Sequence, residues 1–275
     1  MLLVTYISLL FAATCSFANA AEANYTNQGL DKVPMGIPTS TTNLLLSKNN
    51  IAEVAAEDFS GFYQLKTLYL DFNKLQVFPN FSYISSSLEI LFLNNNEIEV
   101  ISESHLDNLV KLKKVLLSYN HLTNIPDVLG PSLTLANLDL TGNRLKDTPC
   151  LTKLGRNLVN VNFNENQIEN IQATCFRALG PGTIKEITFR DNNIATIPER
   201  YDLVSGNRIN LKNNPIICDS CIAWTLEGDV QINGKCDSPI PLFGRNIDDL
   251  TLEDLEEPPL GEGNNCDGVL TNSGK

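Results

Sequence analysis

A short pattern recurs along this chain, and its period limits the fold more than any other feature. The pattern is Leu-x-x-Leu-x-Leu-x-x-Asn-x-Leu, as in the copies Leu65–Leu75 and Leu135–Leu145. Its ninth position holds eight asparagines spaced 22 to 26 residues apart: Asn49, Asn73, Asn96, Asn120, Asn143, Asn166, Asn192 and Asn214. A period in the twenties is typical of a solenoid, in which adjacent coils cover each other's apolar faces.

The spacing inside each copy predicts a short strand with its leucines turned inward. Side chains alternate along a strand, so the residues between the leucines point to the opposite side. Stacked copies then form a parallel sheet over one leucine core, where each buried leucine contributes about 1.5–3 kcal/mol. Asparagine both donates and accepts hydrogen bonds, so at the ninth position it can satisfy backbone groups of its own coil and of the adjacent one.

The return path of each coil is also regular. An apolar residue follows three positions after the pattern in six copies: Val54, Phe78, Ile101, Ile125, Ile171 and Ile197. Proline accompanies this position in four copies: Pro79, Pro126, Pro149 and Pro198. Because proline favours extended backbone, we expect a convex side of extended segments and short turns.

This pattern resembles the leucine-rich repeat, and the resemblance covers about residues 25–266. It implies an α/β solenoid, a leucine-rich-repeat horseshoe with a parallel concave sheet and an irregular convex side. We expect a signal peptide at residues 1–20, an N-terminal cap at 21–40, eight repeats at 41–216, a cysteine-rich C-terminal cap at 217–266 and a tail at 267–275. The cap segment Asn27–Pro38 lacks the cysteines of the family's N-terminal cap, so no N-terminal disulfide is expected.

The first residues predict export. Leu2–Ala13 is almost wholly apolar, and Ala18-Asn19-Ala20 fits the small-residue pattern of signal-peptide cleavage. A membrane anchor is the alternative, but the run is short for a membrane span. We therefore expect a secreted, extracellular protein with no direct membrane insertion. Asn24 and Asn80 begin the sequons Asn24-Tyr-Thr and Asn80-Phe-Ser, which are usable on that route.

The cysteines fit an exported chain. Seven are present, and six remain once Cys15 leaves with the signal peptide, which suggests three disulfides. The segments Asn214–Trp224 and Cys236–Leu250 resemble the family's four-cysteine C-terminal cap, and that resemblance implies the pairs Cys218–Cys236 and Cys221–Cys266. A Cys-x-x-Cys zinc site at Cys218 and Cys221 is the alternative.

Two further features of the sequence concern the remaining cysteines and a run of acidic residues. Cys150 and Cys175 fall on the convex path of adjacent repeats, where we expect them to bridge neighbouring coils; two buried free thiols are the alternative. The segment Asp248–Glu262 holds seven acidic residues and no basic one, and we expect a solvated, mobile loop there.

Charge and chemistry exclude several function classes. The net charge of −12 opposes nucleic-acid binding, and no basic run offsets it. The two histidines, His105 and His121, have no nucleophile at recognisable spacing, and no glycine-rich phosphate loop is present. We expect no enzyme activity, no cofactor and no metal.

The outward column of the sheet carries the binding prediction. At the fifth position of the pattern the residues change from apolar to polar along the chain: Leu45, Tyr69, Phe92, Leu116, Asp139, Asn162, Thr188 and Asn210. Other outward positions add apolar residues to the first half: Phe72, Ile90 and Tyr119. An exposed apolar strip with a polar rim marks an interaction site, and aromatic residues dominate binding hot spots.

We therefore predict that a protein or peptide ligand docks on the first half. The polar second half, with Asp139, Asn162, Arg190, Asp191 and Lys212, would set its orientation. Homodimerisation, or cover by a glycan or a flanking loop, is the alternative; Asn80 belongs to the convex side. The predicted function is soluble extracellular recognition in innate immunity or cell signalling. Matrix structure or adhesion, a receptor ectodomain and an exported hydrolase inhibitor remain alternatives.

Overall fold

The computed structural model describes residues 22–102, 109–126, 134–150, 157–172, 184–197, 208–227 and 231–255. Several features expected from the sequence lie outside these residues: the signal peptide, the tail, His105, Cys175, Pro198 and Cys266. Within the described part of the chain, no helix combines the length and the apolar character that crossing a membrane requires.

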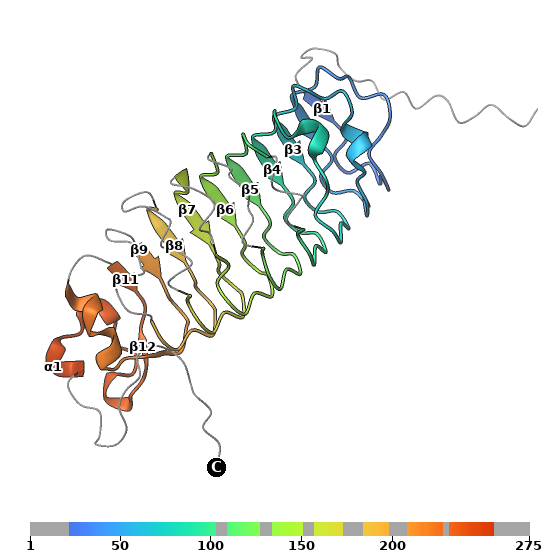
Figure 1. The fold of residues 1–275 in the computed structure, drawn as a ribbon. Helices are drawn as coiled ribbons and strands as arrows, with labels where there is room; N and C mark the ends of the chain where they lie inside the picture. The colour runs from blue at the N-terminus through green and yellow to red at the C-terminus, as the bar shows by residue number, and fades with distance from the viewer. Residues whose placement is uncertain are drawn as a thin grey trace, which may run out of the picture.

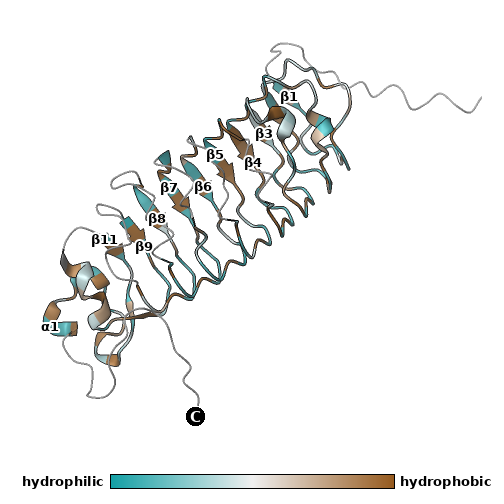
Figure 2. Cartoon of the chain, in the orientation of Figure 1, coloured by the Kyte–Doolittle hydropathy of each residue, from teal (hydrophilic) through white to brown (hydrophobic). Residues whose placement is uncertain are grey.

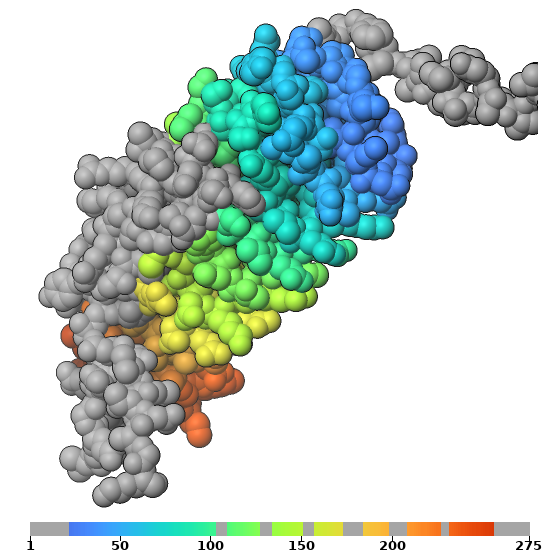
Figure 3. Space-filling view, turned by 45° about the vertical axis from the view of Figure 1, so that its right-hand side comes forward, coloured from blue at the N-terminus to red at the C-terminus, as the bar shows by residue number. Residues whose placement is uncertain are grey.

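The chain forms a solenoid with one parallel sheet along its length, as the sequence predicts (Figure 1). The sheet has ten strands in the order β1-β2-β3-β4-β5-β6-β7-β8-β9-β11. Their bounds are β1 Glu22–Asn24, β2 Asn43–Leu45, β3 Thr67–Tyr69, β4 Ile90–Phe92, β5 Lys114–Leu116, β6 Asn137–Asp139, β7 Asn160–Asn162, β8 Glu186–Thr188, β9 Arg208–Asn210 and β11 Gln231–Asn233. In the space-filling view the described coils follow one another in chain order (Figure 3).

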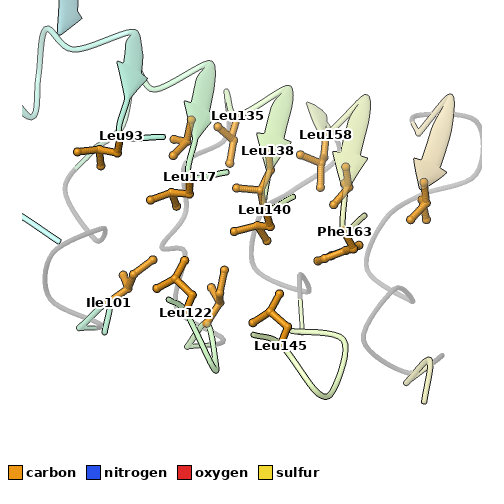
Figure 4. Close-up of a cluster of buried hydrophobic side chains, with 14 of the residues drawn as sticks. Leu93, Ile101, Leu117, Leu122, Leu135, Leu138, Leu140, Leu145, Leu158 and Phe163 are labelled. Carbon is orange, nitrogen blue, oxygen red and sulfur yellow. The ribbon is translucent and has the colours of Figure 1, made fainter. Parts of the chain in front are cut away.

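Each strand buries its middle residue and turns the two flanking residues outward. In β3, Leu68 is fully buried, whereas Thr67 and Tyr69 are partly exposed. The other leucines of the pattern are buried as well, and side chains from successive coils point into one shared core (Figure 4). Phe163 and Phe189 take the leucine position in two coils and stack with ring centroids 5.1 Å apart. A coil alone could not cover this surface, so neighbouring coils stabilise one another.

The asparagine ladder joins each coil to the preceding one. In Asn120, the oxygen Oδ1 accepts the N–H of Ile98 at 3.0 Å, and Nδ2 donates to the carbonyls of Leu93 and Leu117 at 2.9 and 3.0 Å. The same bonds recur at the other seven ladder positions. All eight side chains are buried, so each replaces water for backbone groups that would otherwise lack a partner.

The described convex side is irregular. Two short 3-10 helices, η1 (Ala56–Phe59) and η2 (Ser82–Ile84), occupy the return paths of the first repeats. Five of the six apolar return-path residues are buried: Phe78, Ile101, Ile125, Ile171 and Ile197. Val54 is only partly buried and packs against the core.

The C-terminal cap covers the C-terminal end of the hydrophobic core. Strand β10 (Ile216–Ile217) pairs with β12 (Cys236–Ser238), and the expected disulfide Cys218–Cys236 joins these segments. The 3-10 helices η7 (Ser220–Glu227) and η8 (Ile240–Leu242) complete the cap around them. Cys150 and Cys221 are also disulfide-bonded, which excludes free thiols or zinc ligands at these two positions.

The acidic segment differs from the expected mobile loop in its described part. Residues 247–249 form the 3-10 helix η9 (Ile247–Asp249), and Leu252–Leu255 forms the α-helix α1. The reason is a cation just before the segment: Arg245 Nη2 donates to Asp254 Oδ2 at 3.0 Å. This pairing lowers the pKa of Asp254 to about 2. The buried side chains Ile247, Leu250 and Leu255 anchor the segment to the core.

Candidate functional site

Four apolar side chains form a continuous row on the outward face of the sheet. Leu45 is the direct partner of Tyr69, Tyr69 of Phe92, and Phe92 of Leu116. We call these four residues the apolar strip. All four side chains are partly exposed. The residues directly before and after each of them in the chain, such as Leu68 and Leu70 beside Tyr69, are buried. The row is continuous because neighbouring strands lie about 4.8 Å apart and pair without a shift in register.

The two aromatic rings of the apolar strip lie against each other. The centroids of Tyr69 and Phe92 are 4.3 Å apart, and the ring planes differ by 10°. Such a pair is worth about 0.5–1.5 kcal/mol beyond its buried area. Because the rings support each other, they offer a partner a firm apolar platform at low cost in side-chain entropy.

Three further apolar residues of the predicted site border the apolar strip. Ile90 opens β4 and points outward beside it. Phe72 and Tyr119 follow β3 and β5 in turns with φ of 55°, and their side chains are 47% and 49% exposed. The structure therefore brings the seven predicted residues to one face but places Phe72 and Tyr119 at its rim, beyond the strand ends.

Lysines border this apolar area, although the whole chain is acidic. The Nζ atom of Lys114 lies 5.7 Å from the ring centroid of Phe92, and that of Lys48 lies 5.8 Å from the centroid of Phe72. Lys113 donates to Glu89 at 2.7 Å, and this hydrogen bond lowers the pKa of the Glu89 carboxyl. The cations over the rings add attraction of about 0.5–1 kcal/mol each at exposed sites. A ligand carboxylate would meet them beside the apolar strip.

The second half of the same column is polar, and its groups bond to one another. The Thr141 hydroxyl donates to Asp139 at 2.6 Å, and the Thr188 hydroxyl donates to Asn162 at 2.8 Å. Figure 2 shows the change along the sheet: β4 is hydrophobic along its length, whereas hydrophilic residues interrupt β6 and β8. These groups already have partners within the chain, so the second half gains less from a ligand than the uncovered first half does.

The remaining residues expected to orient a ligand stand at the strand ends. Arg190, Asp191 and Lys212 are all exposed. Asp191 has φ of 58° and accepts from Asn213 Nδ2 at 2.7 Å. Asn210 ends β9 and is partly exposed. They follow the polar half as expected, and Asp191 and Lys212 are neighbours, since the backbone N–H of Asp191 donates to the carbonyl of Lys212 at 3.0 Å.

A cavity of about 460 Å³ lies between the last strands and the C-terminal cap, and the sequence did not point to it. Its lining is polar and includes Glu186, Arg208 and Asp248. Arg208 Nε donates to Gln231 at 3.1 Å, and burial raises the pKa of Asp248. The cavity could not be predicted because it forms only where the cap segment folds back on β11. Arg208 and Asp248 already have hydrogen-bond partners within the chain, which favours the apolar strip as the main site.

The two predicted glycosylation sites, Asn24 and Asn80, lie on different sides of the coil. Asn80 is exposed on the return path, just before η2. Asn24 is the last residue of β1 and the direct neighbour of Leu45. Periodicity alone does not predict this position, because residues 21–40 carry no copy of the pattern and are expected to form the N-terminal cap. A signal is nevertheless present, since Asn24 precedes Leu45 by nearly one repeat length.

No model of a known protein family matches the chain. A curated relative, keratocan of Danio rerio, is 37% identical over 57 residues, which cover 21% of this chain and 16% of keratocan. This chain therefore matches less than a fifth of keratocan's length.

Solved structures of other proteins have a similar fold over most of this chain. A chain from the structure of the Toll–Spatzle complex of Drosophila has a TM-score of 0.64 at 18% identity, and the match covers 82% of this chain and 34% of that chain. A chain from the octameric complex of Latrophilin 3, Unc5D and FLRT2 has a TM-score of 0.50 at 21% identity, covering 84% and 95%. Together with the ladder and the parallel sheet, these likenesses show that this chain has the fold of a leucine-rich-repeat solenoid.

Proposed function

We propose that this chain is a secreted, non-enzymatic recognition protein that binds a protein or peptide ligand on the outward face of its sheet. The observation that carries the proposal is the stacked pair Tyr69–Phe92, partly exposed in the middle of the apolar strip. The stability of a coil does not require aromatic residues there, since the core lies on the other face. An exposed aromatic platform is the usual centre of a binding hot spot.

The lysines at the border of the apolar strip indicate which chemical groups a ligand would carry. Lys48 and Lys114 stand over aromatic rings, where a carboxylate can reach them. The favoured ligand therefore presents apolar side chains with acidic residues beside them, because complementary charge supports specificity and association rate. The polar second half then sets the orientation of the ligand.

Two separate observations support export of the chain and binding of a protein partner. The disulfide Cys218–Cys236 is typical of an oxidising compartment. Both solved structures are complexes of several proteins, which makes a protein ligand the first candidate here. Matrix adhesion and a receptor ectodomain are the alternative functions, and both would also use a binding face.

The test is capture of partners from extracellular fluid with the mature chain. A double variant, Tyr69→Asp with Phe92→Asp, should lose the captured protein while keeping the far-ultraviolet circular dichroism spectrum. The matched control, Tyr63→Asp with Tyr83→Asp, adds the same charge in place of two exposed aromatic residues on the return paths of the first repeats. It should retain capture. Undiminished capture by the first variant would refute the assignment of the site.

Self-association through the apolar strip is the second candidate. Sedimentation of the purified chain distinguishes it, since a dimer that dissociates in the Tyr69→Asp/Phe92→Asp variant would make the ligand a second copy. A monomer at all concentrations would exclude this candidate.

A further inference from the structure

The first glycosylation acceptor lies on the same face of the sheet as the apolar strip. Asn24 ends the edge strand β1 and pairs in register with Leu45, the first residue of the apolar strip. Asn24 is exposed. Side chains alternate along a strand and Ala23 is buried, so Asn24 points to the outward face of the sheet. A group attached to Asn24 therefore starts about 4.8 Å, one strand spacing, from Leu45.

Both sequons form the same local hydrogen bond. The Oδ1 oxygen of Asn24 accepts the backbone N–H of Thr26 at 3.0 Å, and Oδ1 of Asn80 accepts that of Ser82 at 3.0 Å. Both asparagines are exposed. Asn80 lies on the return path, between the buried Phe78 and Phe81 of the convex side. The two sites thus differ in the face they occupy, and Asn80 is a matched internal control.

We propose that Asn24 carries an N-linked glycan that covers the N-terminal end of the apolar strip. The inference rests on the export that is part of the proposed function. The side-chain nitrogen of Asn24 bonds to the anomeric carbon of an oligosaccharide, the bond from that carbon to a lipid pyrophosphate donor breaks, and the amide releases one proton.

The glycan sets the limit of the docking surface. It stands beside Leu45 at the edge of the sheet and leaves Tyr69, Phe92 and Leu116 open towards the polar half. A ligand then approaches from the C-terminal side of the strip. The same glycan protects the edge strand β1 from pairing with another sheet, a hazard of exposed edges.

Occupancy is measured on the full chain made in eukaryotic secretory cells, by mass spectrometry of the two sequon peptides before and after glycosidase treatment. Glycan at Asn24 is the expected result. Glycan at Asn80 with a bare Asn24 would overturn the inference while showing that the chain entered the export route. If neither site is occupied, the inference also fails, and the presence or absence of the chain in the medium then tests export separately.

Shielding is measured with single cysteine variants, Leu45→Cys and Leu116→Cys, and a bulky thiol-reactive polyethylene glycol. The described native cysteines are all disulfide-bonded, so the introduced thiol is distinguishable. Leu45→Cys should react several-fold more slowly than Leu116→Cys. Adding Asn24→Gln should remove that difference, and adding Asn80→Gln should not. Equal rates in the glycosylated chain, or a difference that survives Asn24→Gln, would overturn the shielding.

Discussion

The hydroxyl group of Tyr119 lies 3.3 Å from Oε2 of Glu165, although a complete coil separates the two residues. Gly142 occupies the matching turn of that intervening coil, with φ of 66°. A Cβ atom on Gly142 would lie 2.5 Å from Cδ1 of Tyr119. The tyrosine ring therefore extends over the glycine and joins the apolar half of the face to the polar half.

Replacing this glycine should disturb both the turn and the ring. We expect Gly142→Ala to lower the free energy of unfolding by about 1–2 kcal/mol, because an L-residue is strained in the left-handed region. Displacement of Tyr119 adds to that cost. Urea denaturation measures it, and the double variant with Tyr119→Ala separates the ring contact from the backbone strain. A Gly142→Ala chain as stable as the native one would contradict this geometry.

The same contact predicts a shifted tyrosine titration. The negative charge of Glu165 raises the pKa of Tyr119 above its usual value of about 10. Since the folded-state pKa lies above the unfolded one, the contribution to stability is complete below pH of about 10 and is lost as the pH rises through the raised pKa. Ultraviolet titration of phenolate should show one tyrosine titrating earlier in Glu165→Gln than in the native chain. Identical curves would argue against the contact in solution.

A ladder asparagine should be costly to replace. Asn120→Ala removes the partners of three buried backbone groups, those of Leu93, Ile98 and Leu117. At about 1–3 kcal/mol for each unsatisfied group, we expect a loss of roughly 3 kcal/mol or more in the free energy of unfolding. Asn137→Ala, on the outward face, should change it by less than about 0.5 kcal/mol. Similar losses in the two variants would mean that the ladder does not hold adjacent coils.

The cap disulfide should stabilise its end of the solenoid without affecting the distant apolar strip, the proposed binding surface. The bond Cys218–Cys236 closes a loop with a sequence separation of 18 residues. Replacing both cysteines with serine should cost about 3 kcal/mol, measured by denaturant unfolding. Binding at the apolar strip should persist, because each coil contacts only its neighbours. A loss of binding as large as the loss of stability would instead imply that the cap takes part in recognition.

The repeat architecture is predictable from the sequence because each coil repeats the same local rule. Periodicity alone assigns Leu68 to the core and Asn73 to the ladder, and strand register predicts the row from Leu45 to Leu116. Regular alternation leaves only one face for each position. The fold and the composition of the candidate face therefore follow from the spacing of residues along the chain.

The sequence does not predict features at positions where the repeat pattern does not determine the structure. Tyr119 has a positive φ in the turn after β5. The direction of its side chain therefore depends on the space above Gly142 and on the contact with Glu165. Asn24 belongs to a strand that carries no copy of the pattern. The described part of the acidic segment is held by Arg245, which lies just outside it and donates to Asp254. Each outcome depends on a specific partner rather than on a period.

The most direct test of the proposed binding surface uses two double-alanine variants of this chain and measures, by titration calorimetry, the affinity of each for the captured extracellular protein. Tyr69→Ala with Phe92→Ala should weaken binding by about 30-fold or more, as expected for a hot spot of at least about 2 kcal/mol. Asn137→Ala with Asn160→Ala should leave the affinity within about threefold. An unchanged affinity in the aromatic pair, with loss in the asparagine pair, would contradict the account.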